Sequence, residues 1–289
     1  MIPKCVAESQ AHIGGTRWFD LQDSVSGAVR RVFLWLPPGE APATGWPSLT
    51  MTDGNAVIGT AVDIMRAQAS YPTGSNLGWG ALIAVGYPTD EAYDPFRRSW
   101  DLGPPPGATY PPFWPGTPEV KTGGGAELAR FILEDMRDFL AGHVKLDHTH
   151  AGLFGHSFGG MFALWLLFTQ PGAFSHWIAA SPSITWEDSA LLAHLPSFDP
   201  AGRKLSVHLS AGEWEGDLLA PFRRGAEDAQ KRLEDKANTR TITAAQDLTA
   251  HLARLPGVTA RYETYAGETH MSVLPIAVNR ALHCVLALR

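Results

Sequence analysis

Residues 151–160 read AGLFGHSFGG and join two apolar segments of different kinds. Residues 151–154 form a short apolar run of the kind that makes a strand buried on both faces. Residues 161–169 form a longer apolar run that stops before Pro171 and predicts a helix. Glycines at positions 155 and 159 permit a sharp strand-to-helix turn that side chains would obstruct. The turn is therefore expected to present Ser157 at the end of a sheet.

The rest of the chain alternates between strand and helix patterns. Strands are predicted at residues 17–21, 29–36, 47–52, 81–85, 151–154, 177–180, 205–209 and 259–265. Helices are predicted at residues 57–69, 127–140, 161–169, 218–235, 242–255 and 272–288. Strands that alternate with helices form a mostly parallel central sheet with helices on both faces. The predicted fold class is therefore α/β.

The five-residue pattern G-x-S-x-G at 155–159 is the nucleophile turn of the α/β-hydrolase fold when a strand leads in and a helix leads out. Both conditions are met here. We therefore expect residues 1–289 to form a single α/β-hydrolase domain, with Ser157 as a nucleophile. A Pro/Gly-rich extended loop is expected at about 88–125, and a helical excursion at about 216–256 near the active-site face.

A serine hydroxyl needs a base to accept its proton. In this fold the catalytic residues follow one another as serine, acid and histidine. Of 11 histidines, His270 stands after the last predicted strand and before the last predicted helix, where the base is expected. The acid should follow the strand at 205–209, where we favour Glu215 over Glu213 and Asp217. Its role would be to orient the imidazole and stabilise its cation, and a plain Ser–His pair is the alternative.

An ester hydrolase also needs N–H donors for the developing oxyanion. The N–H group of Phe158, directly after the serine, is the first expected donor. The second is expected in the loop after the strand at 47–52, and the N–H group of Asn55 is the leading candidate. The competing interpretation of this Asp-Gly-Asn sequence is an ordinary turn that closes the strand.

Composition excludes several classes of protein. Hydrophobic residues make up 45% of the chain and charged residues 18%, which is typical of a globular protein with a large core. The net charge of −6 argues against nucleic-acid binding. The longest apolar run, 161–168, falls far short of the roughly 20 residues that cross a bilayer. The two cysteines, Cys5 and Cys284, match no metal site and read as free thiols, with a terminus-to-terminus disulfide as the alternative in an exported protein.

From about residue 16 onward, the sequence resembles the putative-esterase family that includes esterase D and, more narrowly, the enterobactin (catecholate siderophore) esterases. The matching motifs are Asp53-Gly54-Asn55-Ala56, Val85-Gly86-Tyr87 with Arg98 and Asp101, Gly123-Gly124-Gly125-Ala126-Glu127, Gly155-His156-Ser157-Phe158-Gly159-Gly160, Ser181-Pro182-Ser183 with Trp186, and Glu268-Thr269-His270-Met271-Ser272-Val273. The stretch after Arg98 reads Asp101-Leu102-Gly103-Pro104, where relatives often carry an aromatic residue and a threonine.

The resemblance implies hydrolysis of the trilactone ester bonds of a catecholate siderophore such as ferric enterobactin, which permits release of the iron. It implies that Arg98 faces the anionic iron–catecholate group, and Trp186 and Trp214 are expected as walls of the site. We expect no cofactor and no metal in the chemistry, since any iron belongs to the substrate. A general carboxylesterase or thioesterase is the alternative, and a non-catalytic ligand-binding homologue is a third reading.

The expected partner is a small anionic aromatic molecule, with neither nucleic acid nor membrane. The paired arginines Arg223-Arg224 read as a solvated helix face. The first residues lack the apolar stretch of a secretory signal. The short members that the chain resembles are often periplasmic, so a periplasmic protein with its signal removed is expected, with a cytoplasmic protein as the alternative.

Overall fold

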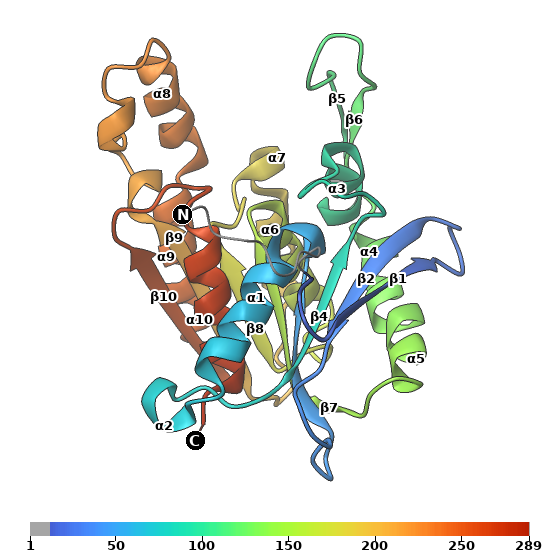
Figure 1. The fold of residues 1–289 in the computed structure, drawn as a ribbon. Helices are drawn as coiled ribbons and strands as arrows, with labels where there is room; N and C mark the ends of the chain where they lie inside the picture. The colour runs from blue at the N-terminus through green and yellow to red at the C-terminus, as the bar shows by residue number, and fades with distance from the viewer. Residues whose placement is uncertain (1–11, 289) are drawn as a thin grey trace, which may run out of the picture.

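An eight-stranded sheet runs through the centre of the computed structural model, which describes residues 12–288 (Figure 1). Its strands are β1 (Thr16–Gln22), β2 (Val29–Trp35), β3 (Trp46–Met51), β4 (Ala81–Gly86), β7 (Leu146–His156), β8 (His176–Ala180), β9 (Leu205–Gly212) and β10 (Val258–Tyr265). Their order is β1-β2-β4-β3-β7-β8-β9-β10. β1, β2 and β4 pair antiparallel in turn, and every pair from β4 to β10 is parallel. The predicted mostly parallel sheet is confirmed.

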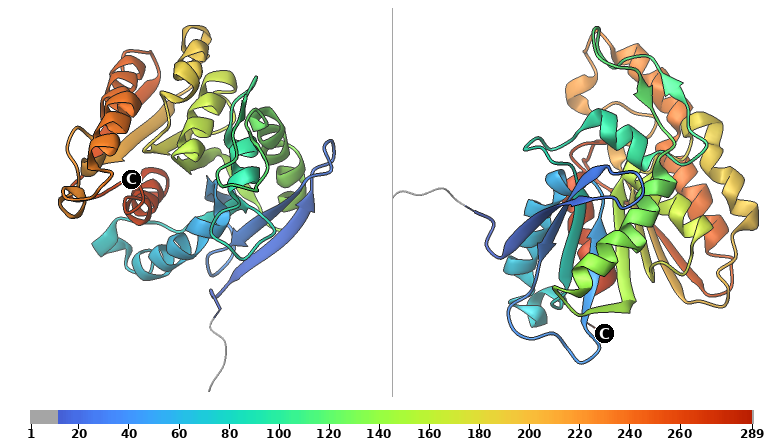
Figure 2. Two further views of the ribbon diagram at one scale, coloured as in Figure 1. Left: turned by 90° about the horizontal axis from the view of Figure 1, so that it is seen from above. Right: turned by 90° about the vertical axis from the view of Figure 1, so that its right-hand side faces the viewer.

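Helices cover both faces of this sheet, which Figure 2 shows from above. One face carries α1 (Gly54–Gln68) and α10 (Leu274–Leu286), which contact each other. The other face carries α4 (Gly125–Leu133), α5 (Asp135–Ala141), α6 (Phe158–Thr169) and α9 (Thr241–Leu252). Each face has its own hydrophobic cluster of buried side chains. Because both faces are covered, β4 is buried along its whole length, as the continuous apolar run predicts.

Two of the predicted helices are wrong in extent. The helix predicted at 127–140 is broken at Glu134, which has φ −115° and ψ −82°. The break turns the Asp135 carboxylate toward the backbone N–H of Ser24, a bond of 2.9 Å that sequence periodicity does not reveal. The helix predicted at 218–235 is a short 3₁₀ turn, η3 (Pro221–Arg223), and a later helix, α8 (Ala229–Thr239). Pro221 is confined to the first position of that turn because it lacks an N–H donor.

The stretch predicted as an extended loop at 88–125 contains regular structure. It holds helix α3 (Pro95–Leu102) and the two-stranded hairpin of β5 (Thr109–Tyr110) and β6 (Val120–Lys121). Pro95 occupies the first turn of α3, and the Asp94 carboxylate caps it by accepting the backbone N–H of Arg97 at 3.1 Å. Figure 1 shows α3 and this hairpin beyond the same end of the sheet as α8, at the top of the view. The remaining short elements are α2 (Pro72–Ser75), α7 (Trp186–Ser189), η1 (Ala190–Ser197) and η2 (Glu213–Glu215).

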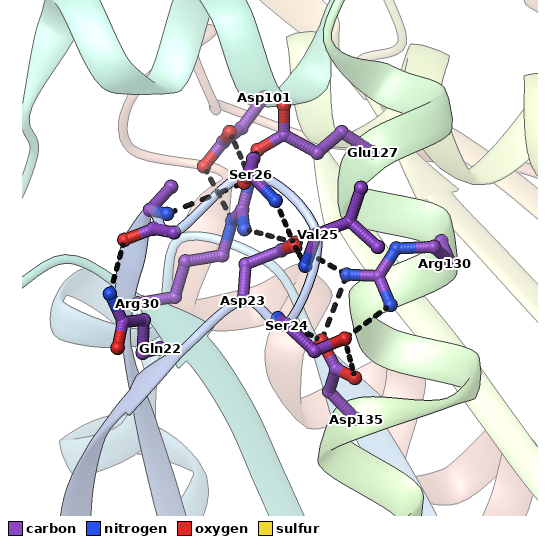
Figure 3. A network of polar contacts seen from close by, with 12 residues as sticks. Gln22, Asp23, Ser24, Val25, Ser26, Arg30, Asp101, Glu127, Arg130 and Asp135 are labelled. Carbon is purple, nitrogen blue, oxygen red and sulfur yellow. Dashed lines mark hydrogen bonds and ion pairs between the residues drawn. The ribbon is translucent and has the colours of Figure 1, made fainter.

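A network of arginines and carboxylates ties α3 to the turn between β1 and β2 (Figure 3). Arg30 is fully buried and binds both oxygens of Asp101, at 3.1 and 2.8 Å. It also contacts Asp23 at 3.0 Å and Glu127 at 2.7 Å. Arg130 joins the same network through Asp23 at 2.5 Å. The last turn of α3, which carries Asp101, is therefore fixed to the sheet. None of the helices within residues 12–288 has both the length and the apolar character needed to cross a membrane.

Candidate active site

Ser157 stands at the turn between β7 and α6 with a backbone that non-glycine residues rarely adopt, at φ 59° and ψ −115°. The turn is possible because its flanks are glycines. A Cβ atom at position 155 would overlap the carbonyl oxygen of Gly159, and one at position 159 would overlap Thr52 Oγ1. The sharp turn predicted from the glycine spacing is therefore present, and it raises Ser157 above the end of the parallel strands.

A continuous line of hydrogen-bond distances runs from Ser157 through His270 to Glu215. Ser157 Oγ lies 3.0 Å from His270 Nε2, and His270 Nδ1 lies 2.6 Å from Glu215 Oε2. These side chains come from three loops, since Glu215 follows β9 in η2 and His270 follows β10. Because a carboxylate can only accept, His270 donates its Nδ1 proton to Glu215, which leaves Nε2 free to accept a proton from the serine.

Of the three candidate acids, the structure brings only Glu215 to the histidine. Glu215 is buried, and its Oε1 accepts the Ser181 hydroxyl at 2.5 Å and the Gly212 N–H at 2.8 Å. Burial opposes its ionisation, but the hydrogen bonds from His270, Ser181 and Gly212 outweigh burial and lower the pKa of Glu215. Glu213 instead accepts the Gly267 N–H at 2.6 Å, and Asp217 is exposed.

His156 supports His270 from the other side. Its Nε2 donates to the carbonyl oxygen of His270 at 2.7 Å, and the two rings lie 4.7 Å apart between centroids. Burial, with the nearby His270, lowers the pKa of His156 to about 3, so its imidazole is neutral. Sequence reasoning missed this contact and the Ser181–Glu215 bond. The adjacency of His156 to the serine and the position of Ser181 after β8 were the available signals.

A cavity of about 960 Å³ opens beside Ser157 and His270. Its walls are strongly aromatic. Trp186 packs edge-on against Phe158 at 4.7 Å and near Tyr110 at 5.3 Å, measured between ring centroids. Trp214 and the 72% exposed Phe222 line the opposite part. The structure therefore places Trp186, Trp214 and Phe158 around the serine, as the sequence predicts.

The structure places Asn55 and Arg98 next to the serine turn but outside the residues that line the cavity. Asn55 begins α1, where its side-chain oxygen accepts the Tyr87 N–H at 2.9 Å and its amide donates to the Thr89 carbonyl at 2.8 Å. The guanidinium of Arg98 forms an ion pair with Asp53 at 2.8 Å. The backbone N–H of Asn55 as an oxyanion donor and Arg98 as a substrate ligand both stay predictions.

Besides Arg232, which pairs with Asp228, two cations that the sequence did not single out as site residues line the cavity from the helical excursion. Arg223 lies in η3, and its guanidinium stands 5.6 Å from the ring centroid of Phe222. Lys236 of α8 donates to the carbonyl oxygens of Trp214 and Gly216. Within residues 12–288, neither cation forms an ion pair with a carboxylate. The sequence predicts that Arg223 lies on a solvated helix face; the residue is exposed, but it lies in a 3₁₀ turn and lines the cavity, which the sequence does not reveal.

The described residues contain no group of three or more His, Cys, Asp and Glu side chains that could hold a metal ion. Cys284 lies on α10, and burial raises the pKa of its thiol to about 11. Cys5, its suggested disulfide partner, lies outside the described residues.

Comparisons with known proteins identify the family of this chain. The family model described as "Putative esterase" matches residues 24–272. The chain is 31% identical to the ferri-bacillibactin esterase BesA of Bacillus subtilis over 262 residues, covering 88% of this chain and 84% of that protein. It is 33% identical to the siderophore triacetylfusarinine C esterase of Aspergillus fumigatus, covering 82% and 80% of the two chains.

A solved structure of similar shape is the siderophore hydrolase EstA from Aspergillus nidulans. It superposes with a TM-score of 0.81 at 28% identity, over 96% of this chain and 97% of that chain. The family match spans most of the chain, including the serine turn, the loop of Glu215 and His270. This protein therefore belongs to the esterase family, whose members are carboxylic ester hydrolases with the α/β-hydrolase fold.

Proposed function

We propose that this protein is a serine esterase that hydrolyses the trilactone ester bonds of a catecholate siderophore such as ferric enterobactin. The observation that carries the proposal is the line from Ser157 Oγ to His270 Nε2 at 3.0 Å and from His270 Nδ1 to Glu215 at 2.6 Å. Nucleophile, base and orienting acid stand in the order and geometry of a hydrolase triad. The relatives named for ferri-bacillibactin, enterobactin and salmochelin support the substrate class.

In the proposed reaction Ser157 Oγ attacks the ester carbonyl while His270 Nε2 takes the hydroxyl proton. The negative charge that develops on the carbonyl oxygen is bound by the N–H groups of Phe158 and Asn55. His270 then returns the proton to the departing alcohol, and the acyl-enzyme remains on the serine. A water molecule, deprotonated by the same imidazole, releases the acid. Glu215 holds the imidazole in the required tautomer throughout and stabilises its cationic form.

The cavity suits a bulky, aromatic substrate, and its lining carries charges of both signs, with Glu187, Asp188 and Asp235 beside Arg223, Arg232 and Lys236. Its volume of about 960 Å³ is at the upper end of small-molecule sites. Trp186, Trp214 and Phe222 offer ring faces for catechol groups, and Arg223 and Lys236 supply positive charge that no carboxylate within residues 12–288 neutralises by an ion pair. A periplasmic location belongs to the same proposal, and fractionation of the native host cells tests it.

Replacement of the nucleophile tests the chemistry. Ser157→Ala is expected to lower kcat on ferric enterobactin by about 10⁴-fold or more, because the remaining site offers only binding and oxyanion donors. Binding of the ferric siderophore, followed by quenching of tryptophan fluorescence, should stay within about threefold of the wild type. Ser197→Ala, a serine on η1 outside the cavity lining, is the control and should keep full activity. Full hydrolysis by Ser157→Ala would exclude the mechanism.

A substrate series tests the specificity. We expect kcat/KM to be highest for ferric enterobactin, lower for a neutral ferric hydroxamate triester, and lowest for p-nitrophenyl butyrate. Arg223→Gln should reduce the first value and leave the third unchanged, since the small ester carries no charge. A higher kcat/KM for p-nitrophenyl butyrate than for ferric enterobactin, with both values unchanged in Arg223→Gln, would identify a general carboxylesterase instead.

A further inference from the structure

Arg98 connects two backbone turns that meet beneath Ser157. Its Nε donates to Asp53 Oδ1 at 2.8 Å, and Asp53 ends the turn between β3 and α1. Its Nη2 donates to the carbonyl oxygen of His156 at 3.3 Å, the residue immediately before Ser157. The guanidinium also lies over the ring of Phe158, 5.6 Å from the centroid, on the other side of the serine. One side chain therefore touches both neighbours of the nucleophile and the adjacent turn.

These two turns carry the two N–H groups assigned to the oxyanion. Phe158 lies in the first turn and Asn55 lies in the second, two residues after Asp53. The turns are in direct contact, because a Cβ atom at Gly159 would overlap Thr52 Oγ1 and would lie 3.5 Å from Asp53 Oδ2. The separation of the turns fixes the separation of the two donors, and an oxyanion hole depends on donors held about 2.7–3.1 Å from the charge they stabilise.

Arg98 is not available to a ligand in the cavity. Its side chain is only 17% exposed and it does not line the cavity. Asp53 is buried and neutralises its charge at close range. The helix that carries Arg98 is immobilised one turn later, where Arg30 Nε and Nη2 both donate to the carboxylate of Asp101. A guanidinium anchored at both ends suits the positioning of backbone groups more than the capture of a mobile anion.

We propose that Arg98, together with Asp53, is a positioning residue that sets the geometry of the oxyanion hole rather than a ligand of the siderophore. The inference rests on the proposed serine mechanism. It replaces the role that the family resemblance implied for Arg98. A planar guanidinium with several donors can hold Asp53 and the His156 carbonyl at the same time, whereas a lysine offers one point charge and would keep the ion pair while losing the bridge.

The test compares Arg98→Lys and Asp53→Asn with the wild type on two substrates, p-nitrophenyl acetate and ferric enterobactin. We expect kcat to fall by about 10- to 100-fold on both, because small displacements of catalytic groups have effects of this size. KM should change by less than about threefold on either substrate. The double variant should be little worse than each single one, since both changes break the same bridge.

An inhibitor separates positioning from loss of structure. An aryl boronic acid forms a tetrahedral adduct on the serine, and its inhibition constant should rise in Arg98→Lys by about the factor by which kcat falls. The control is Arg280→Lys, which alters an ion pair with Glu263 at 2.7 Å outside the cavity lining and should leave both values unchanged. Circular dichroism and thermal unfolding establish that each variant is folded at the assay temperature.

Three results would overturn the inference. A loss seen only with ferric enterobactin, and only in KM, would make Arg98 a substrate ligand. Wild-type kcat in folded Arg98→Lys would leave it without a role in the reaction. A fall in kcat with no change in boronic acid affinity would place its effect outside the oxyanion hole. Ser157→Ala in the same series distinguishes failure of the two proposals. If Ser157→Ala hydrolyses esters, the serine mechanism fails. If Ser157→Ala is inactive while Arg98→Lys keeps wild-type activity, only the positioning role of Arg98 is rejected.

Discussion

Two arginine–carboxylate clusters hold adjacent turns of α3, and they differ in how completely their polar groups are satisfied. At the end that carries Asp101, the Arg30 network of Figure 3 gives each buried carboxylate oxygen a partner. One turn earlier, Arg98 pairs with Asp53, but Asp53 Oδ2 and Thr52 Oγ1 are buried and have no hydrogen-bond partner within residues 12–288. The first cluster has the character of a structural anchor, and the second lies beside the turn of Ser157.

The two clusters also differ in the backbone strain of the residues around them. Asp53 and Ser157 both have positive φ values, 54° and 59°, and both belong to the turns that Arg98 bridges. The charged residues of the Arg30 network, Asp23, Arg30, Asp101, Glu127 and Arg130, have no positive φ values. Strained and incompletely paired groups persist only where the surrounding structure over-determines them. The Arg30 network thus fixes the last turn of α3 with its polar groups satisfied, and the adjacent turn carries Arg98, which contacts the strained and incompletely paired turns.

The largest expected effect comes from removing the centre of the satisfied cluster. Arg30→Met removes the close cation of buried Asp101 and one of the two cations that contact Asp23, and it should lower the free energy of unfolding by about 3–5 kcal/mol. Urea unfolding followed by tryptophan fluorescence measures it. kcat of the folded fraction should fall less than in Arg98→Lys, because the Arg98–Asp53 pair itself remains. The control is Arg31→Met on the same strand, whose partly exposed pair with Asp20 should contribute about 1 kcal/mol or less. Equal effects of the two changes would contradict the comparison.

Acid should weaken the same cluster. Arg130 lowers the pKa of Asp135, and in Asp23 and Glu127 the opposing effect of burial is outweighed by hydrogen bonds and nearby arginines, so their pKa values are also lowered. A lowered folded-state pKa gives stability that is present above the unfolded value of about 4 and is lost as pH falls below it. Asp101 acts in the opposite sense, since burial raises its pKa despite Arg30.

We therefore expect the free energy of unfolding to be about 1–3 kcal/mol lower at pH 3 than at pH 7. Urea titrations at a series of pH values in constant salt measure the change. In Arg30→Met the dependence should be shallower, because the carboxylates lose the cation that favours their ionised forms. If the free energy of unfolding of the wild type does not change from pH 7 to pH 3, the ionised carboxylates of the network do not contribute to stability and the prediction is wrong.

The smallest expected effect lies at the edge of the network. Asp135→Asn removes the negative charge and one of the two carboxylate oxygens, which bind Arg130 at 2.8 Å and the Ser24 hydroxyl at 2.7 Å. Because solvent reaches these side chains, the loss should be about 1 kcal/mol or less, well below that of Arg30→Met. High salt should reduce the difference between Asp135→Asn and the wild type, whereas it should not restore Arg30→Met. A loss as large as that of Arg30→Met would place the anchor at Asp135 instead.

The sequence predicted the fold through local and repeating signals. Buried parallel strands appear as apolar runs, and the elements predicted at 81–85 and 205–209 correspond to β4 and β9. The predicted extents of two helices were wrong because of contacts with distant parts of the chain. Glu134 interrupts one because Asp135 bonds to a turn that lies 111 residues away in sequence. The segment around Pro221 leaves the helical path to form part of a cavity wall.

At the candidate site, glycine spacing and chain order were enough to nominate Ser157 and His270. Both signals can be read directly from the chain. A tight turn restricts which residues can flank it, and the fold fixes the order in which its catalytic loops follow one another. They did not separate Glu215 from Glu213 and Asp217, which share one short loop with similar chemistry.

The sequence by itself thus determined the α/β class, the serine turn and the loop that carries the histidine. Only the tertiary structure decided which carboxylate reaches His270, that Arg98 is bound to Asp53, and that Arg223 faces the cavity. The physical reason is the range of the interactions. Backbone sterics and hydrophobic periodicity act over a few residues, whereas a hydrogen bond between Glu215 and His270 joins positions 55 residues apart and exists only after the parallel strands have aligned.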